Sequence, residues 1–137
     1  MAGYSGTTQL KKLGIKEGFR IALVGAPQGF DDELGSLPSG TTVLARPTKP
    51  LDFALLFTKS EKDLLKNLPR LAERLAPAGM LWIAWPKKAS GVATDLSDNV
   101  VRNIGLDAGL VDVKVCAVTE IWSGLKFVYR LKDRPKK

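Results

Sequence analysis

The sequence predicts an α/β fold, with a mainly parallel sheet that ends in a C-terminal antiparallel hairpin. Residues 52–57 and 80–85 are almost wholly apolar, as expected of strands that are covered on both faces. A helical pattern lies between them, and a strand–helix–strand order is typical of parallel neighbours. Residues 111–118 and 125–131 are separated by a tight turn at residues 120–124, which predicts the hairpin.

The central helix is predicted from apolar residues at helical spacing between Leu64 and Leu75. Ser60 is a residue type that caps helix N-termini. Pro69 interrupts the pattern and predicts a kink or a break. Pro77 and Gly79 are expected to end the helix before the strand at residues 80–85.

The remaining elements are predicted from short apolar runs and turn residues. They are a helix over residues 7–13, a strand over 20–24, a short acidic helix over 31–34, a strand over 41–45 and a helix ending near residue 108. Thr94, Asp95 or Ser97 is expected to cap the last helix. The buried strand at residues 80–85 is expected to lie beside residues 52–57 and to run in the same direction.

Composition limits the classes of protein. The chain has 137 residues, of which 45% are hydrophobic, enough for one domain over residues 1–131 with a basic flexible tail over 132–137. No apolar run approaches the roughly 18 residues that span a bilayer, and the N-terminus lacks a signal-peptide core. We therefore expect a cytoplasmic protein that does not bind membranes.

Histidine is absent and Cys116 is the single cysteine, which excludes Ser-His-Asp and Cys-His machinery and cysteine-rich zinc sites. Cys116 is expected to be a packed, inert thiol, and Trp82 a core residue. The acids Asp31, Asp32 and Glu33 are interpreted as helix-start charges. No metal site is predicted.

The net charge of +7 is concentrated at the C-terminus, where residues 126–137 hold six basic residues and one acid. Such a segment either is a solvated chain end or contacts RNA, DNA or an acidic partner without specificity. Lys114 and Lys126 are predicted on one face of the hairpin with Asp112 nearby. We interpret that face as an ordinary solvated surface, with a nucleic-acid surface as the alternative.

The order of elements resembles the class I methyltransferase fold over residues 52–131. Asp52 opens its run as an acid opens the fourth strand of that family, and Leu75-Ala76-Pro77-Ala78-Gly79 matches the family's L-x-P-x-G motif. The resemblance implies a Rossmann-like sheet. The whole chain also resembles a small uncharacterised bacterial family of unknown function, over residues 85–91, 110–118 and 122–126, which implies no activity.

The first half departs from the methyltransferase pattern. Gly25-Ala26-Pro27-Gln28-Gly29 keeps the outer glycines of the G-x-G-x-G loop but has Pro27 at the middle position. The acid expected after the second strand is missing, and Arg46 lies nearby instead. Residues 26–51 are too few for two further full βα units, so we expect a reduced, methyltransferase-like Rossmann sheet.

Ligands bind beyond the carboxyl ends of parallel strands, where residues 25–30, 57–60 and 85–94 are expected to meet. Cationic, hydroxyl and glycine residues before a helix suit a phosphate or carboxylate, and two tryptophans could form flat walls. The candidate ligand-binding residues are Gly25, Pro27, Gly29, Trp85, Lys87, Lys88, Ser90, Gly91, Thr94 and Trp122. Alternatively, Lys87 and Lys88 pair with Glu120 or Asp95, and both tryptophans belong to the core.

We therefore expect a non-catalytic binding or regulatory module for an anionic small molecule or partner, without a cofactor. One alternative is a degenerate methyltransferase that uses S-adenosylmethionine. Another is a nucleic-acid-associated protein that uses the basic tail. The ligand, the oligomeric state and whether any reaction is catalysed remain open at this point.

Overall fold

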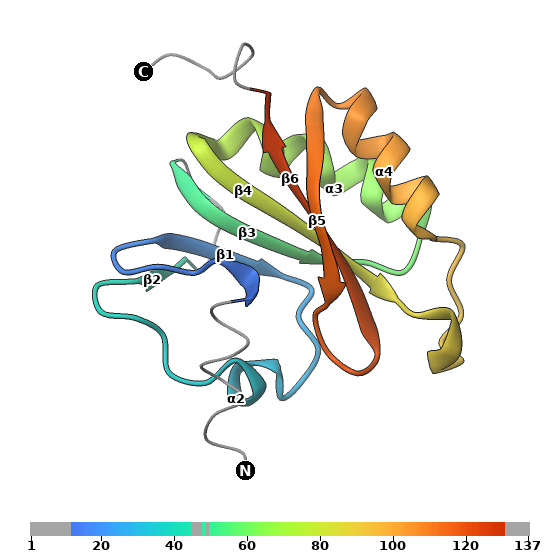
Figure 1. Cartoon of the computed structure of the whole chain (residues 1–137), viewed down its shortest axis with the longest axis horizontal. Coiled ribbons are helices and arrows are strands. Elements are labelled where there is room, and N and C mark those ends of the chain that lie inside the picture. The colour runs from blue at the N-terminus through green and yellow to red at the C-terminus, as the bar shows by residue number, and fades with distance from the viewer. Residues whose placement is uncertain (1–11, 45–47, 49, 131–137) are drawn as a thin grey trace.

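The structure is a computed structural model that describes residues 12–44, 48 and 50–130 (Figure 1). Most of the helix predicted over residues 7–13 lies outside the described residues. So do Ala45, Arg46, the end of the predicted strand at Leu131 and the predicted tail over residues 132–137.

A single mixed sheet forms the centre of the molecule. Its strands are β1 (Arg20–Val24), β2 (Thr42–Val43), β3 (Leu51–Phe57), β4 (Leu75–Pro86), β5 (Leu110–Ala117) and β6 (Trp122–Tyr129), in the spatial order β2-β1-β3-β4-β6-β5. The first four strands of that order are parallel, whereas β6 pairs antiparallel with β4 and β5. The predicted α/β fold, with its C-terminal hairpin, is confirmed.

The pairing of β3 with β4 is the one the sequence predicts. Phe53 is opposite Met80 and Phe57 is opposite Ala84, so the two apolar runs lie side by side and point the same way. The strands shift register between Leu51 and Phe53. At this end of the pair a Cβ on Gly79 would lie 2.5 Å from the carbonyl oxygen of Leu51, so only glycine fits there.

Helix α3 (Glu61–Arg74) begins at the predicted cap, because the Ser60 hydroxyl accepts a 3.1 Å hydrogen bond from the Asp63 amide. Of the kink or break predicted at Pro69, the break does not occur, since the helix is continuous through that residue. Pro69 has no amide hydrogen, so the Leu65 carbonyl loses its helical hydrogen bond. Both residues are exposed, so water can replace that bond. The helix ends at Arg74 and β4 starts at once, before the predicted stop at Pro77.

Smaller differences occur at other element ends. The strand predicted over residues 41–45 is reduced to Thr42–Val43 in the described chain, and the predicted loop after β4 contains a 3-10 turn, η1 (Lys88–Ser90). Helix α2 (Phe30–Leu34) forms as predicted, and α4 (Asp98–Asp107) is capped by Ser97. The hairpin turn lies earlier than the predicted residues 120–124, because β5 ends at Ala117 and β6 starts at Trp122, whose carbonyl accepts from the Val118 amide at 2.8 Å.

The core lies on both faces of the sheet. Helices α3 and α4 cover one face, where Leu64, Leu68 and Val101 are fully buried. Leu13, Ile15 and helix α2 cover the other face. Trp82 is fully buried there, as predicted, and its indole Nε1 donates to the Leu13 carbonyl at 2.9 Å. No helix among the described residues is both long and apolar enough to cross a membrane.

Replacing Gly105 by alanine should destabilise the fold. Gly105 of α4 packs on the Phe127 ring of β6, and a Cβ there would lie 2.1 Å from Phe127 Cε1. Overpacking of this kind costs about 1–3 kcal/mol, more than the roughly 1 kcal/mol that alanine gains over glycine in helix propensity. The free energy of unfolding, measured by urea titration, should therefore fall in Gly105→Ala.

The matched control is the same change in a Phe127→Leu background, where the shorter side chain leaves room for the added methyl group. The cost of Gly105→Ala should then shrink by about 1 kcal/mol or more. Strictly additive costs in the double variant would contradict the proposed steric contact.

Candidate functional site

The strand order reverses between β1 and β3. The chain leaves β1 outward to β2, then returns past β1 to form β3, so the carboxyl ends of β1 and β3 diverge into connections on opposite sides. In open α/β sheets ligands bind in the crevice at such a point. A cavity of about 450 Å³ lies here, which we call the switch-point pocket. It is lined by Gly25, Pro27, Phe57, Thr58, Lys59, Ser60, Asp63 and Trp122.

Gly25 allows the two strand ends to approach each other. Its φ is +71°, and a Cβ at this position would lie 2.8 Å from the carbonyl oxygen of Phe57. Both the backbone conformation and the close contact therefore require glycine. In the following loop, the Pro27 carbonyl accepts a 3.1 Å hydrogen bond from the Phe30 amide, which starts α2. Gly29 has a φ of +87° and lines neither pocket described here.

The polar wall of the switch-point pocket is built around Asp63. Its Oδ2 accepts from the Thr58 hydroxyl at 2.7 Å, and its Oδ1 accepts from Asn67 Nδ2 at 3.0 Å. Thr58 is itself held in place, because its amide donates to the Ala84 carbonyl at 2.9 Å. These bonds fix the carboxylate in position at the pocket wall, and its remaining lone pairs stay free to accept from a ligand.

The two tryptophans predicted as site walls lie on opposite faces of the sheet. Trp122 is opposite Pro86 and Trp85 is opposite Ser123, so their side chains alternate. Trp122 packs edge-on against Phe57, with ring centroids 5.1 Å apart, and both tryptophans are buried. The structure does not bring them to one ligand, and the alternative that both belong to the core describes them better.

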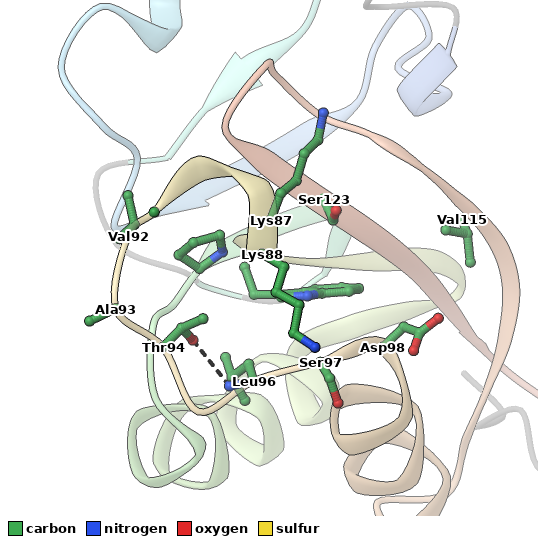
Figure 2. Close-up of a pocket in the computed structure, with 13 residues that line it drawn as sticks. Lys87, Lys88, Val92, Ala93, Thr94, Leu96, Ser97, Asp98, Val115 and Ser123 are labelled. Atoms are coloured by element: carbon green, nitrogen blue, oxygen red, sulfur yellow. Dashed lines mark hydrogen bonds between the residues drawn. The ribbon is translucent and has the colours of Figure 1, made fainter.

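A second cavity of about 600 Å³ lies beyond the carboxyl end of β4 (Figure 2). We call it the β4–α4 pocket. Of the predicted site residues, it contains Trp85, Lys87, Lys88, Gly91 and Thr94. The Lys88 side chain extends toward Ser97 and Asp98 at the start of α4, whereas Lys87 points away from them toward the hairpin. The predicted residues are thus divided between two pockets.

Ser90 and Thr94 hold the loop that borders the β4–α4 pocket. Ser90 Oγ donates to the Lys87 carbonyl at 2.6 Å and accepts from the Val92 amide at 3.1 Å, and Ser90 lines neither pocket. Thr94 Oγ1 donates to the Lys59 carbonyl and accepts from the Leu96 amide. Both hydroxyls therefore shape the backbone rather than point at free space.

The ion pairs that the alternative interpretation expects for Lys87 and Lys88, with Glu120 or Asp95, do not form in the part of the chain that the structure describes. Neither lysine forms an ion pair there, and the one salt bridge joins Arg102 to Asp112. Asp95 Oδ1 instead accepts from the Glu61 amide at 2.8 Å. The described residues also hold no group of three acidic, cysteine or histidine side chains that could bind a metal ion.

The hairpin places Lys114 directly opposite Lys126, as predicted, but not beside Asp112. The register shifts between Asp112 and Lys114, so the extra residue Val113 turns Asp112 to the opposite face. There Asp112 Oδ2 lies 3.0 Å from Arg102 Nε of α4. The alternation of residues in the sequence gave no signal for this bulge. The bulge leaves Lys114 and Lys126 without Asp112, the acid expected beside them.

Electrostatics on this face follow from that arrangement. The pKa of Lys126 is lowered, mainly by burial and further by the charges of Lys114 and Lys16. Burial raises the pKa of the Cys116 thiol, although Lys12 and Lys114 oppose that shift. A raised pKa makes Cys116 a poor nucleophile, in agreement with its interpretation as an inert thiol.

Comparison with known proteins shows similarity of fold. No protein-family model and no curated protein sequence matches the chain. Many solved structures are similar to most of it, and three of them serve as examples. Magnesium protoporphyrin IX methyltransferase from Synechocystis PCC 6803, crystallised with bound SAH (S-adenosylhomocysteine), is 12% identical over 91% of this chain and 83% of that one, with a TM-score of 0.60.

The second is a SAM-dependent methyltransferase from Aquifex aeolicus, 19% identical over 89% of this chain and 88% of that one, with a TM-score of 0.58. The third is the fibrillarin pre-rRNA processing protein from Methanococcus jannaschii, 12% identical over 83% of this chain and 67% of that one, with a TM-score of 0.61. These likenesses confirm the methyltransferase-like fold. The resemblance to a bacterial family of unknown function stays a prediction.

Two expectations from the sequence are corrected by these comparisons. We expected a non-catalytic module for an anionic ligand, and no cofactor. The Aquifex protein is a SAM-dependent methyltransferase, and the Synechocystis methyltransferase was crystallised with SAH in one structure and with SAM in another. The comparisons therefore favour the methyltransferase alternative, although Pro27 and Arg46 had argued against it in the sequence.

Neutralising Lys126 should stabilise the protein. Because the folded state lowers the pKa of Lys126, its charge disfavours folding at every pH below that lowered pKa. Like charges directly opposite in a hairpin cost up to about 1 kcal/mol, less at exposed sites. Lys126→Gln should raise the free energy of unfolding at pH 7 by a few tenths of a kcal/mol.

The gain should shrink as the pH rises toward the ordinary lysine value of 10.5, because the wild-type side chain then loses its charge. Urea titrations at pH 7 and pH 10 measure this. Lys62→Gln, at an exposed position on α3, is the control and should change stability little. A loss of stability in Lys126→Gln at pH 7 would contradict the proposed repulsion.

Proposed function

We propose that the chain is an S-adenosylmethionine-dependent methyltransferase and that the cofactor binds in the switch-point pocket. The observation that carries the proposal is the position of this cavity, at the carboxyl ends of β1 and β3 where the strand order reverses. Its volume of about 450 Å³ also falls in the range of small-molecule sites. Fold alone does not establish an activity, so the pocket residues must be tested against the cofactor.

The residues of the pocket fit the charged groups of this cofactor. The fixed Asp63 carboxylate suits the amino group of the methionine part, and Lys59 suits its carboxylate. Gly25 leaves the strand end uncovered by a side chain, which lets a ligand approach the backbone.

Pro27 limits what the loop after β1 contributes. It has no amide hydrogen, and its carbonyl is already bonded to the Phe30 amide. The loop therefore offers fewer donors to an anionic group than an all-glycine loop would. Lys59, from the connection after β3, lines the pocket and supplies a cation in place of those missing donors.

When bound, S-adenosylmethionine supplies an electrophilic methyl group on a sulfonium sulfur. The residues of the chain then have to hold the cofactor and exclude water from the reacting atoms. Trp122 and Phe57 form the apolar side of the pocket, packed edge to face. Asp63 is held by Thr58 and Asn67, so its role is to anchor a cationic group in a fixed position.

Isothermal titration with S-adenosylmethionine and S-adenosylhomocysteine tests the proposal. The wild type should bind both. Asp63→Asn keeps the side-chain shape but removes the charge, and its affinity should fall about tenfold or more, because a hydrogen bond to a charged group is lost. Circular dichroism confirms that the variant is folded.

Gly25→Ala gives a second variant with a matched control. It should also abolish binding, because its Cβ would collide with Phe57. Gly18→Ala carries the same kind of backbone strain, with a φ of +77°, but no atom lies within 4 Å of its added Cβ. Gly18→Ala should therefore keep the wild-type affinity. Absence of binding to folded wild-type protein would refute the proposal.

A further inference from the structure

One surface outside both pockets carries several lysines close together. We call Lys12, Lys16, Lys114 and Lys126 the lysine face. Lys114 and Lys126 are directly opposite on β5 and β6, and Lys114 Nζ donates to the Lys12 carbonyl at 2.9 Å. A Cβ on Gly14 would lie 3.9 Å from Lys126 Nζ, so residues 12–16 run along the same side of the hairpin.

These charges have no acidic partner among the described residues. The salt bridge that the structure describes, Arg102–Asp112, lies on the other face of the sheet because of the bulge at Val113. Glu17, next to Lys16, pairs with none of the four lysines. Like charges opposite each other in a sheet are destabilising, so the fold maintains an uncompensated repulsion. A ligand that brings its own negative charge would relieve it.

The shape of this surface distinguishes between anionic ligands. Small-molecule sites are concave, yet none of the four lysines lines the switch-point pocket, the β4–α4 pocket, the cavity between β1 and α3 or the cavity between α3 and α4. Charges spread over a hairpin face and an adjoining segment match an extended polyanion better than a single phosphate. The sequence that follows Lys126 is also basic, since residues 127–137 hold five basic residues and one acid.

We propose that the lysine face binds the phosphodiester backbone of a nucleic acid, and that a nucleic acid is the methyl acceptor. The second part rests on the proposed function: a nucleophilic nitrogen or oxygen of the nucleic acid forms a bond to the methyl carbon while the carbon–sulfur bond of S-adenosylmethionine breaks, and S-adenosylhomocysteine and one proton are released. Trp122, Gly124 and Lys126 point to the same face of β6, and Trp122 lines the switch-point pocket. Four residues of a β-strand span about 13 Å. A nucleic-acid strand bound at Lys126 therefore extends to the cofactor pocket. Backbone contacts of this kind bind without sequence specificity.

Fluorescence anisotropy with a labelled single-stranded RNA of mixed sequence, at several salt concentrations and without S-adenosylmethionine, tests the binding. The variant is Lys114→Gln/Lys126→Gln. The control is Lys62→Gln/Lys66→Gln, which removes the same charge from exposed positions on α3. If two phosphate contacts are lost, the slope of log affinity against log salt should decrease by about 1.4 in magnitude. The affinity itself should fall about tenfold or more, with little change in the control.

Three results would overturn the proposal. In the first, the control loses as much affinity as the variant, which indicates a net-charge effect. In the second, only neutralising Lys132, Arg134, Lys136 and Lys137 reduces binding, which assigns it to the C-terminal segment. In the third, polyglutamate displaces the RNA at the same charge concentration, which indicates an acidic protein partner.

Two measurements separate this proposal from folding and from the proposed function. The melting temperature of Lys114→Gln/Lys126→Gln should equal or exceed that of the wild type, because a repulsion is removed. Its affinity for S-adenosylmethionine should be unchanged, because neither lysine lines the switch-point pocket. Transfer of labelled methyl groups to RNA should be reduced in Asp63→Asn mainly at low S-adenosylmethionine concentration, and in the lysine variant mainly at low RNA concentration. Wild-type labelling of protein but not RNA would refute the acceptor class while leaving cofactor binding intact.

Discussion

The parallel pairing of β3 with β4 is the constraint on which the rest of the structure depends. Both strands are apolar on both faces, so each must be covered from two sides. Parallel neighbours require a connection that crosses the length of the sheet, and α3 makes this crossing while it covers one face. The same pairing brings the ends of β3 and β4 to one edge, where both pockets lie.

The switch-point pocket is a direct result of this topology. Gly25 and Phe57 end two neighbouring strands whose connections leave in different directions, and the missing side chain of Gly25 lets them meet. The pocket is polar where α3 begins, because two of its lining residues, the cap residue Ser60 and the first-turn acid Asp63, are the polar residues that start this helix. Residues that stabilise the crossover helix therefore also provide the polar wall of the site.

The lysine face shows how a local irregularity changes electrostatics. Without the bulge at Val113, Asp112 would lie on the same side as Lys114 and could neutralise it. With the bulge, Asp112 pairs with Arg102 and ties α4 to the edge of the sheet. One extra residue thus stabilises one face and leaves the other strongly positive.

Much of the fold could be predicted because the signals are local. The two apolar runs, the cap at Ser60 and the short spacing before β3 each depend on residues close in sequence. They were sufficient for the element order, the parallel pair and the reduced sheet. The break, one of the two outcomes predicted at Pro69, does not occur because burial of Leu68 and Leu71 on one side holds the helix together despite the lost hydrogen bond.

The composition of the site was decided by tertiary structure. Whether Trp85 and Trp122 share a face depends on the register of β4 against β6, and the position of Asp112 depends on a bulge between β5 and β6. Thr58 lies in the stretch 57–60 that the sequence places at the ligand edge, whereas Asp63 gave no signal beyond that of a helix start. Register is set by the packing of side chains distant in the chain, and a slip of one residue exchanges the two faces. Local patterns therefore specify which elements form, whereas which side chains meet at a site depends on how those elements align.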